Sequence, residues 1–366
     1  MTTAAPLQQG FLVVLADPAR TRGWPDGERS RASKVWFHGY LADPAHVRAD
    51  LGLDRLATTA QILSAAYTRW GAGVIERVTG EYAAVLVTGD DAVVIGDRMG
   101  LRPVYIADRT TDIVISTDLG LLACETTAWR DVDEEYVADS LATGFHLGTR
   151  TPYRDIRRLG LGEHATWRAG VLKVAGGWRP RTDTVDGTAR EHEGLLRTAV
   201  GQAVAGALPP NTGVAVELSG GLDTSTVLAA AAQHAPVHAV SFVHPGAPDS
   251  DESAWMRVAL ETTPAPWHPI DATTHGIFTA GPDFGVFLPA PTRRILNWAS
   301  SAAEDAVLAR LDVSTVLTGE GGDAVFLAGV LPWYLADLLR TGRWPQLRRE
   351  LLRWSTDSEV RRSAGF

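Results

Sequence analysis

The sequence predicts an α/β protein of two domains, an antiparallel α+β sandwich followed by a doubly wound parallel α/β domain. Short apolar runs separated by turn residues fill the first half, whereas the second half alternates such runs with helical patterns. Residues 176–190 between the halves are rich in Gly, Arg, Thr and Asp, which is typical of a linker. The length of 366 residues also suits two domains. The predicted domains are residues 1–180 and 190–366.

The strands of the first domain are predicted to be antiparallel, because turn residues join neighbouring apolar runs. Residues 88–91, Thr-Gly-Asp-Asp, have the composition of a hairpin turn. A helix is expected at residues 59–70, where Ile62, Ala66 and Trp70 share a face. The predicted strands are residues 11–16, 35–40, 82–87, 92–95, 104–106 and 113–115.

The second domain is predicted to hold a parallel sheet, because its strands alternate with helices. The predicted strands are residues 214–218, 237–243 and 314–318. The predicted helices are residues 193–207, 224–234, 251–262 and 302–311. Residues 344–354 form a further basic, amphipathic segment.

The composition excludes several classes of protein. With 45% apolar and 21% charged residues the chain is globular, and no apolar run approaches the ~18 residues of a membrane span. A net charge of −9 argues against a nucleic-acid partner. No basic segment precedes the first apolar run, so a cytoplasmic location is expected. The single cysteine, Cys124, rules out a disulfide framework, and we expect it to be a buried, small apolar residue.

A strand, a glycine loop and a helix meet at residues 218–225, Leu-Ser-Gly-Gly-Leu-Asp-Thr-Ser. Backbone N–H groups at a helix start hold phosphate without a lysine, and Gly220 and Gly221 let the backbone approach the anion. The carboxylate of Asp223 would repel phosphate unless it holds a Mg²⁺ that bridges the phosphates. The predicted phosphate-binding residues are Ser219, Gly220, Gly221, Asp223, Thr224 and Ser225.

A second glycine-rich loop, residues 318–323 or Thr-Gly-Glu-Gly-Gly-Asp, follows the third strand. Ligands of open α/β sheets lie outside the carboxyl ends of the strands, so both loops are expected to face one crevice. Asp323 is then placed to share the metal with Asp223. Glu320, set among glycines, is expected to project into the site.

The two loops together resemble the synthetase domain of asparagine synthetase and its relatives. The first loop is similar to the Ser-Gly-Gly-x-Asp-Ser-Ser loop of N-type ATP pyrophosphatases, with Thr224 in place of a serine. Residues 237–249 continue the likeness. The resemblance implies ATP and Mg²⁺, attack of a carboxylate on the α-phosphate, and attack of an amine on the acyl-adenylate. Leu218, Phe242 and Gly319 are then expected to border the adenosine.

The first half resembles the class II glutamine amidotransferase domain, in residues 80–83, 96–105, 115–118 and 149–159. A glutaminase of this class needs an N-terminal cysteine as its nucleophile. This chain begins Met-Thr-Thr, and Gln9 stands near the start of the first strand, where that cysteine is expected. We therefore expect a scaffold domain without glutaminase activity.

The identity of residue 320 separates the relatives whose amine comes from the substrate itself. The resemblance places a tyrosine there in β-lactam synthetases and a glutamate in asparagine synthetase and lasso-peptide cyclases. A carboxylate at Glu320 could accept the proton of the attacking amine as a general base. This favours macrolactam cyclisation of a precursor peptide, and it implies a leader-binding protein and a leader peptidase as partners. A β-lactam-type or other small-molecule amide synthetase remains the alternative.

The end of the chain departs from the family. Relatives continue through a helical region that supplies a lysine, whereas residues 324–366 contain none. The ATP-binding domain is therefore expected to be shortened. Either the chain is a fragment, or the remainder is a separate polypeptide, or an arginine takes the place of that lysine. This departure keeps open a further alternative, a non-catalytic ATP-binding subunit.

Overall fold

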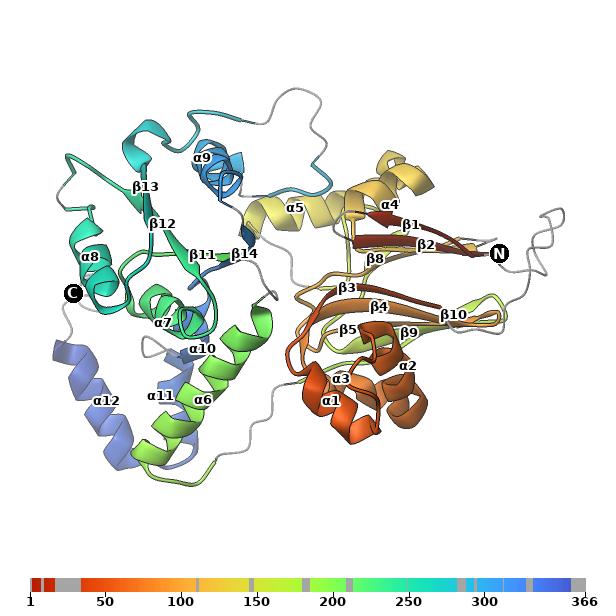
Figure 1. The fold of residues 1–366 in the computed structure, drawn as a ribbon, viewed down its shortest axis with the longest axis horizontal. Helices are drawn as coiled ribbons and strands as arrows, with labels where there is room; N and C mark the ends of the chain where they lie inside the picture. Colours follow the sequence, from red (N-terminus) through yellow and green to blue (C-terminus); the bar gives the residue numbers. More distant parts are fainter. Residues whose placement is uncertain are drawn as a thin grey trace. The chain divides into compact units, whose positions relative to one another are not determined.

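The computed structural model describes residues 2–7, 10–16, 34–109, 112–144, 148–179, 185–208, 213–247, 249–281, 288–292, 295–311, 313–326 and 332–356. The chain divides into two compact units (Figure 1). The first consists of Met1–Asn211 and Asp271–Asp312, and the second of Thr212–Ile270 and Val313–Phe366. Each unit is therefore assembled from two separate stretches of sequence, while the division at 180–190 remains a prediction.

The first unit contains two five-stranded antiparallel sheets, as the alternation of apolar runs and turns predicted. A core of side chains from both sheets fills the space between them, including Phe11, Val13 and Ile115 from one and Val85 and Val94 from the other. One sheet has the order β1 (Thr2–Leu7), β2 (Gly10–Ala16), β7 (Asp112–Ser116), β6 (Tyr105–Asp108), β8 (Ile156–Arg158). The other has the order β10 (Val171–Gly176), β9 (Glu163–Arg168), β5 (Asp91–Gly96), β4 (Gly80–Thr88), β3 (Lys34–Leu41).

Helices cover the outer faces of both sheets. Ile62 and Ala66 of α2 pack with Tyr82 and Leu86 of β4 on the second sheet, and α4 packs its leucines on the first. Helix α2 has the predicted bounds because a capping box between Thr58 and Gln61 fixes its start. The helices of this unit are α1 (Pro44–Leu51), α2 (Thr59–Trp70), α3 (Val74–Arg77), α4 (Leu119–Thr126), α5 (Glu134–Thr143), α6 (Ala189–Ala207) and α9 (Trp298–Leu308), with 3-10 turns at Gly71–Gly73, Ala128–Arg130 and Ala272–Thr274.

The second unit is built on a four-stranded sheet in the order β13–β12–β11–β14. Strand β11 (Gly213–Glu217) pairs in parallel with β12 (Val237–Val243) on one side and with β14 (Val313–Leu317) on the other. The order of the strands reverses at β11, so the ends of β11 and β14 form a topological switch point. The remaining elements are β13 (Trp267–Asp271), α7 (Leu222–Ala231), α8 (Ser253–Thr262), α10 (Gly322–Phe326), α11 (Pro332–Arg340) and α12 (Trp344–Thr356).

Several sequence predictions differ from the structure. Helix α6 begins at Ala189, four residues before the predicted start, because Thr188 and Glu191 form a capping box. Cys124 is exposed, so its predicted burial was wrong. The reason is the helix face: Leu122 and Ala123 of α4 are buried, whereas Cys124 lies on the other side. Gln9 lies outside the described residues. No helix within the described ranges is both long and apolar enough to span a bilayer.

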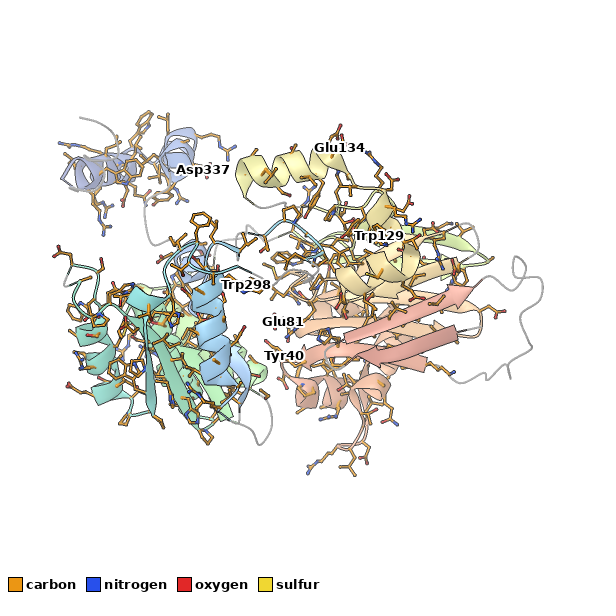
Figure 2. All side chains as sticks on the ribbon, turned by 90° about the horizontal axis from the view of Figure 1, so that it is seen from above. Tyr40, Glu81, Trp129, Glu134, Trp298 and Asp337 are labelled. Atoms are coloured by element: carbon orange, nitrogen blue, oxygen red, sulfur yellow. The ribbon has the colours of Figure 1, made fainter. Side chains whose placement is uncertain are left out.

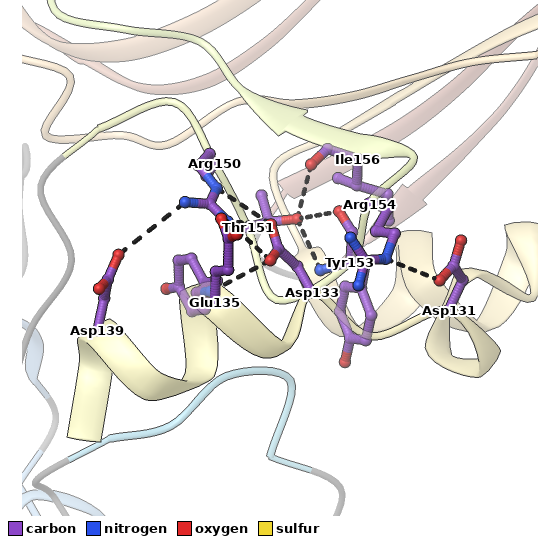
Figure 3. A network of polar contacts seen from close by, with 10 residues as sticks. Asp131, Asp133, Glu135, Asp139, Arg150, Thr151, Tyr153, Arg154 and Ile156 are labelled. Atoms are coloured by element: carbon purple, nitrogen blue, oxygen red, sulfur yellow. Dashed lines mark hydrogen bonds and ion pairs between the residues drawn. The ribbon is translucent and has the colours of Figure 1, made fainter. Parts of the chain in front are cut away.

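A charged network braces the start of α5 in the first unit (Figure 3). Asp133 accepts the backbone N–H of Tyr136 and three hydrogen bonds from the Arg150 guanidinium, one at 3.0 Å and two at 2.7 Å. Arg154 pairs with Asp131, and the hydroxyl of Thr151 bonds the carbonyl of Ile156 at 2.6 Å. Asp133, Arg150, Thr151, Arg154 and Ile156 are among the residues that line a pocket of about 160 Å³. Because each arginine that Figure 3 labels already has a carboxylate partner, we interpret the network as structural.

Replacing Asp133 with asparagine should lower the melting temperature of the first unit by a few degrees. Hydrogen bonds from Arg150 hold the pKa of Asp133 below its ordinary value. A lowered pKa in the folded state contributes stability above the ordinary aspartate value of about 4, and that contribution is lost as the pH falls through the folded value. Calorimetry should therefore find a constant deficit for Asp133→Asn near neutral pH and a shrinking one in acid. Asp139→Asn, at 3.9 Å from Arg150, is the control; a deficit that persists unchanged in acid would contradict the assignment.

Candidate functional site

The first motif forms the turn between β11 and α7. Gly221 caps α7 without any side-chain hydrogen bond to the helix start. The first N–H groups of a helix have no partner within the helix, so those of α7 point towards the loop with the positive end of the helix dipole. This is the local geometry of an anion site. The predicted phosphate-binding role of the loop therefore has a structural basis, in backbone rather than in side-chain charge.

Hydroxyl groups hold the loop in shape. The N–H of Ser219 donates to Oγ1 of Thr224 at 3.1 Å, and the two hydroxyl oxygens lie 3.0 Å apart. The N–H of Gly221 donates to Oγ of Ser219 at 3.3 Å, and the N–H of Ser225 to the carbonyl of Gly221 at 3.1 Å. These bonds close the loop on itself before any ligand is bound, which reduces the ordering needed when a ligand binds.

Gly220 brings the loop against the start of α8. Its φ of +84° lies in the left-handed region. A Cβ atom on Gly220 would be 2.7 Å from both the Trp255 Cβ and the Met256 nitrogen. The start of α8 is itself anchored by Asp251, whose carboxylate accepts the N–H and the hydroxyl of Ser253; the hydroxyl bond lowers the pKa of Asp251. The contact with α8 was not predicted, since a Gly-Gly pair signals a turn but not its neighbour.

The second motif forms the turn from β14 into α10 and touches the first. The N–H of Glu320 donates to Oγ1 of Thr318 at 3.3 Å, and that of Gly322 to the carbonyl of Gly319 at 3.2 Å. A Cβ on Gly319 would be 2.7 Å from Cγ2 of Thr224. One on Gly322 would collide with the carboxylate of Asp223. The structure therefore brings the two loops into contact, as their places at the strand ends predicted.

The three acidic residues of the site differ in exposure. Asp223 is half-buried against Gly322, whereas Glu320 and Asp323 are exposed. Glu320 lies between the two glycines that contact the first loop, and Asp323 directly follows the second of them. Within the described ranges, no group of three or more His, Cys, Asp and Glu side chains forms a metal site. Mg²⁺ in nucleotide sites is bound through one or two carboxylates plus phosphate oxygens, and the paired loops offer carboxylates of that kind.

The residues predicted to border the adenosine lie at the same sheet edge. Leu218 has only 2% of its side chain exposed, so it offers its backbone rather than its side chain to a ligand. Its N–H donates to the carbonyl of Val240 at 2.8 Å, which ties the loop to β12. Phe242, two residues further along β12, is half-buried. Together with Gly319 these residues come from the carboxyl ends of three adjacent strands, and their role remains a prediction.

A second polar cluster lies in the first unit. Tyr40 and Glu81 are paired across β3 and β4 (Figure 2), and Glu81 forms an ion pair with Arg102 at 3.6 Å. Burial and the charge of Arg102 lower the pKa of His38. Because side chains alternate along a strand, His38, Tyr40 and Glu81 face the core between the sheets. Cys124 is on α4, which packs on the outer face of the other sheet, so this cluster contains no thiol.

The fold and the site thus define a two-part protein, an antiparallel amidotransferase-like sandwich and a parallel α/β unit with a nucleotide-type loop. Comparison with protein families agrees. A glutamine amidotransferase domain model matches residues 34–177, and the asparagine synthase model matches residues 195–365. Together the two matches support the asparagine synthetase superfamily, and the second implies ATP as the nucleotide.

Two solved structures show weaker likenesses. One is a glutamine phosphoribosylpyrophosphate amidotransferase from B. subtilis complexed with ADP and GMP, at 12% identity over 80% of this chain and 72% of that chain, with a TM-score of 0.29. The other is described as the allosteric regulatory enzyme of purine biosynthesis, at 14% identity over 79% and 70%, with a TM-score of 0.30. No curated protein matches the chain.

Replacing Gly220 with alanine should disrupt the first loop. We expect a loss of about 2–4 kcal/mol in the free energy of unfolding of the second unit, from left-handed strain and overpacking against α8. Gly246→Ala is the matched control, because Gly246 has a φ of +86° but open space around its Cα. Thermal unfolding and ATP titration of both variants test this. Equal losses in the two would show that strain alone, and not contact with α8, requires glycine at position 220.

Proposed function

We propose that this protein is an ATP-dependent ligase that forms an amide bond through an acyl-adenylate, and that its reaction is macrolactam cyclisation of a lasso precursor peptide. The observation that carries the proposal is the contact between the two loops, in which Asp223 and Thr224 meet Gly319 and Gly322 at the switch point of the sheet. The coarser part, a synthetase of the ATP-dependent amide-forming family, also has the support of the asparagine synthase match.

We assign the phosphates and the metal ion to different groups of the two loops. We assign the pyrophosphate portion of ATP to the N–H groups of residues 220, 222 and 223 and to the hydroxyl of Ser225, since the N–H groups of Ser219 and Gly221 donate within the loop. Asp223 and Asp323 supply carboxylates that would hold Mg²⁺. When bound, this ion would offset the charge of the phosphates. Without a bound cation the carboxylate of Asp223 would repel the phosphates, which is why we assign it to the metal rather than to the anion.

The proposed reaction consists of two transfers, adenylation of a carboxylate and then aminolysis of the acyl-adenylate. A substrate carboxylate oxygen attacks the α-phosphorus, and the bond from that phosphorus to the pyrophosphate oxygen breaks. The amine then attacks the acyl carbon, and AMP leaves with the electron pair of the acyl–oxygen bond. The nitrogen loses its extra proton to Glu320, our proposed general base. Exposure of Glu320 between two glycines leaves its carboxylate accessible to a substrate amine.

We propose that the amine comes from the substrate and not from glutamine. A glutaminase of class II needs a thiolate, and the single cysteine of the sequence lies on the outer helix α4. The first unit would then act as a scaffold. A lasso precursor peptide as substrate would also imply a leader-binding protein and a leader peptidase as partners.

Mass spectrometry tests the proposal directly. A leader-free candidate precursor peptide is incubated with the full chain, ATP and Mg²⁺, while AMP release is followed in parallel. Loss of one water per peptide together with AMP release is the expected result. AMP release with a small β-amino acid substrate but with no peptide would favour a β-lactam-type synthetase. ATP binding without AMP release from any substrate would overturn the proposal in favour of a non-catalytic subunit.

Replacing Asp223 with asparagine should abolish AMP release. The amide keeps the shape of the side chain but removes the charge that would hold the metal ion. Asp249→Asn, in an exposed loop of the same unit, should retain activity. Retained turnover in Asp223→Asn would remove this residue from the metal site.

Replacing Glu320 with glutamine should separate binding from amide formation. ATP affinity should stay within about twofold, because residue 320 lies in the second loop and is not one of the predicted phosphate-binding residues. The rate of amide formation should fall by about 10²–10⁴-fold, the usual contribution of a general base. ATP titration and product formation measured on the same preparation provide the check, and a rate close to that of the unmodified chain would exclude Glu320 as the base.

A further inference from the structure

The side chain of Thr224 engages both loops, each through a different atom. Its hydroxyl accepts the N–H of Ser219 at 3.1 Å and lies 3.0 Å from the hydroxyl of that residue. Its methyl group, Cγ2, faces the second loop, where a Cβ added to Gly319 would come within 2.7 Å of it. The Ser-Gly-Gly-x-Asp-Ser-Ser loop of the ATP pyrophosphatases has a serine at this position. A serine would keep the hydroxyl contact with Ser219 and lose the methyl contact with Gly319.

The hydroxyl contact shapes the phosphate-binding loop. The hydroxyl of Thr224 contacts that of Ser219, and the hydroxyl of Ser219 accepts the N–H of Gly221 at 3.3 Å. Residues 224, 219 and 221 are thereby linked in one series of hydrogen bonds. The two N–H groups in these hydrogen bonds, those of Ser219 and Gly221, belong to the segment that turns from β11 into α7. Thr224 is therefore a structural part of the loop, and its Oγ1 is engaged by the protein itself.

The methyl contact sets the distance between the loops. Gly319 has no side chain, so the backbone of the second loop rests against Cγ2 and the backbone nitrogen of Thr224. Gly319 immediately precedes Glu320, the proposed base. Removing the methyl group would leave a gap there, and close packing is lost over even such a small gap.

We propose that Thr224 is a positioning residue that couples the two loops: its hydroxyl preforms the phosphate-binding loop and its methyl group seats the loop that carries Glu320. This inference rests on the proposed function, because it assigns ATP to the first loop and the amine chemistry to the second. It predicts that the two halves of one side chain can be separated by substitution. Thr224→Ser removes only the methyl group, and Thr224→Val replaces the hydroxyl with a second methyl group.

Hydrogen exchange at single-residue resolution, together with ATP titration, separates these effects on the full chain. Thr224→Ser should speed exchange of the Glu320 and Gly322 amides about threefold to tenfold and leave the Ser219 amide and ATP affinity within about twofold. Thr224→Val should speed exchange of the Ser219 amide and weaken ATP binding about threefold to tenfold. If the chain also releases AMP, Thr224→Ser should lower kcat with little change in the KM for ATP.

Thr226, exposed on the same helix, supplies matched controls as Thr226→Ser and Thr226→Val. Should Thr224→Val not fold, Thr224→Ser alone decides: second-loop exchange equal to that of the unmodified chain would overturn the inference. Uniform acceleration across both loops would likewise overturn it, because a general loss of stability would then explain the effect. Failure of the unmodified chain to bind ATP would instead count against the proposed function, whatever the exchange pattern shows.

Discussion

The parallel pairing of β11 with β14 is the constraint on which the rest of the site depends. Residues 214–216 of β11 align with residues 315–317 of β14, so both strands end at the same edge and their loops begin side by side. The glycines then decide how near the loops come. A side chain at Gly319 would collide with the backbone nitrogen of Thr224, and one at Gly322 would displace the carboxylate of Asp223. A pairing between segments about a hundred residues apart thereby brings Glu320 and the phosphate-binding loop into one site.

Most of this arrangement could be predicted from local sequence, because its elements carry local signals. Strand β12 and helix α2 have the predicted bounds, and both motif loops lie at strand ends as expected. The order of the strands in the sheet could not be predicted in this way, because no local sequence signal indicates that β14 lies beside β11. Strand β13 was missed because Pro269 and His268 interrupt its short apolar pattern. The burial of Cys124 was wrongly predicted for a similar reason. Residue type predicts only average burial, whereas the exposure of this side chain depends on the face of α4 on which it lies.

The loop to which we assign the phosphates of ATP contains no lysine, so binding there would rest on backbone geometry. The two lysines of the sequence are Lys34 and Lys173, both in the first unit. In the second unit the loop uses the dipole of α7, an uncapped helix start and hydroxyl groups that fix the backbone. Such a loop depends on shape more than on charge. That dependence explains why Gly220 contacts the backbone of α8 so closely, and it agrees with our proposal that Asp223 is the partner of a cation.

The interleaving of the two units offers a physical reason for an amidotransferase-like unit that lacks a thiol between its sheets. Residues 271–312 belong to the first unit, where Ala290 packs against the core of its first sheet, and only then does the chain return as β14. The second unit is therefore not a continuous piece of sequence. Its central pairing of β11 with β14 closes a loop whose last part, residues 271–312, belongs to the first unit, and an ordered segment costs less entropy to close than a flexible one of the same length. Loss of the first unit would thus weaken the contact between the two motif loops even if that unit performed no chemistry.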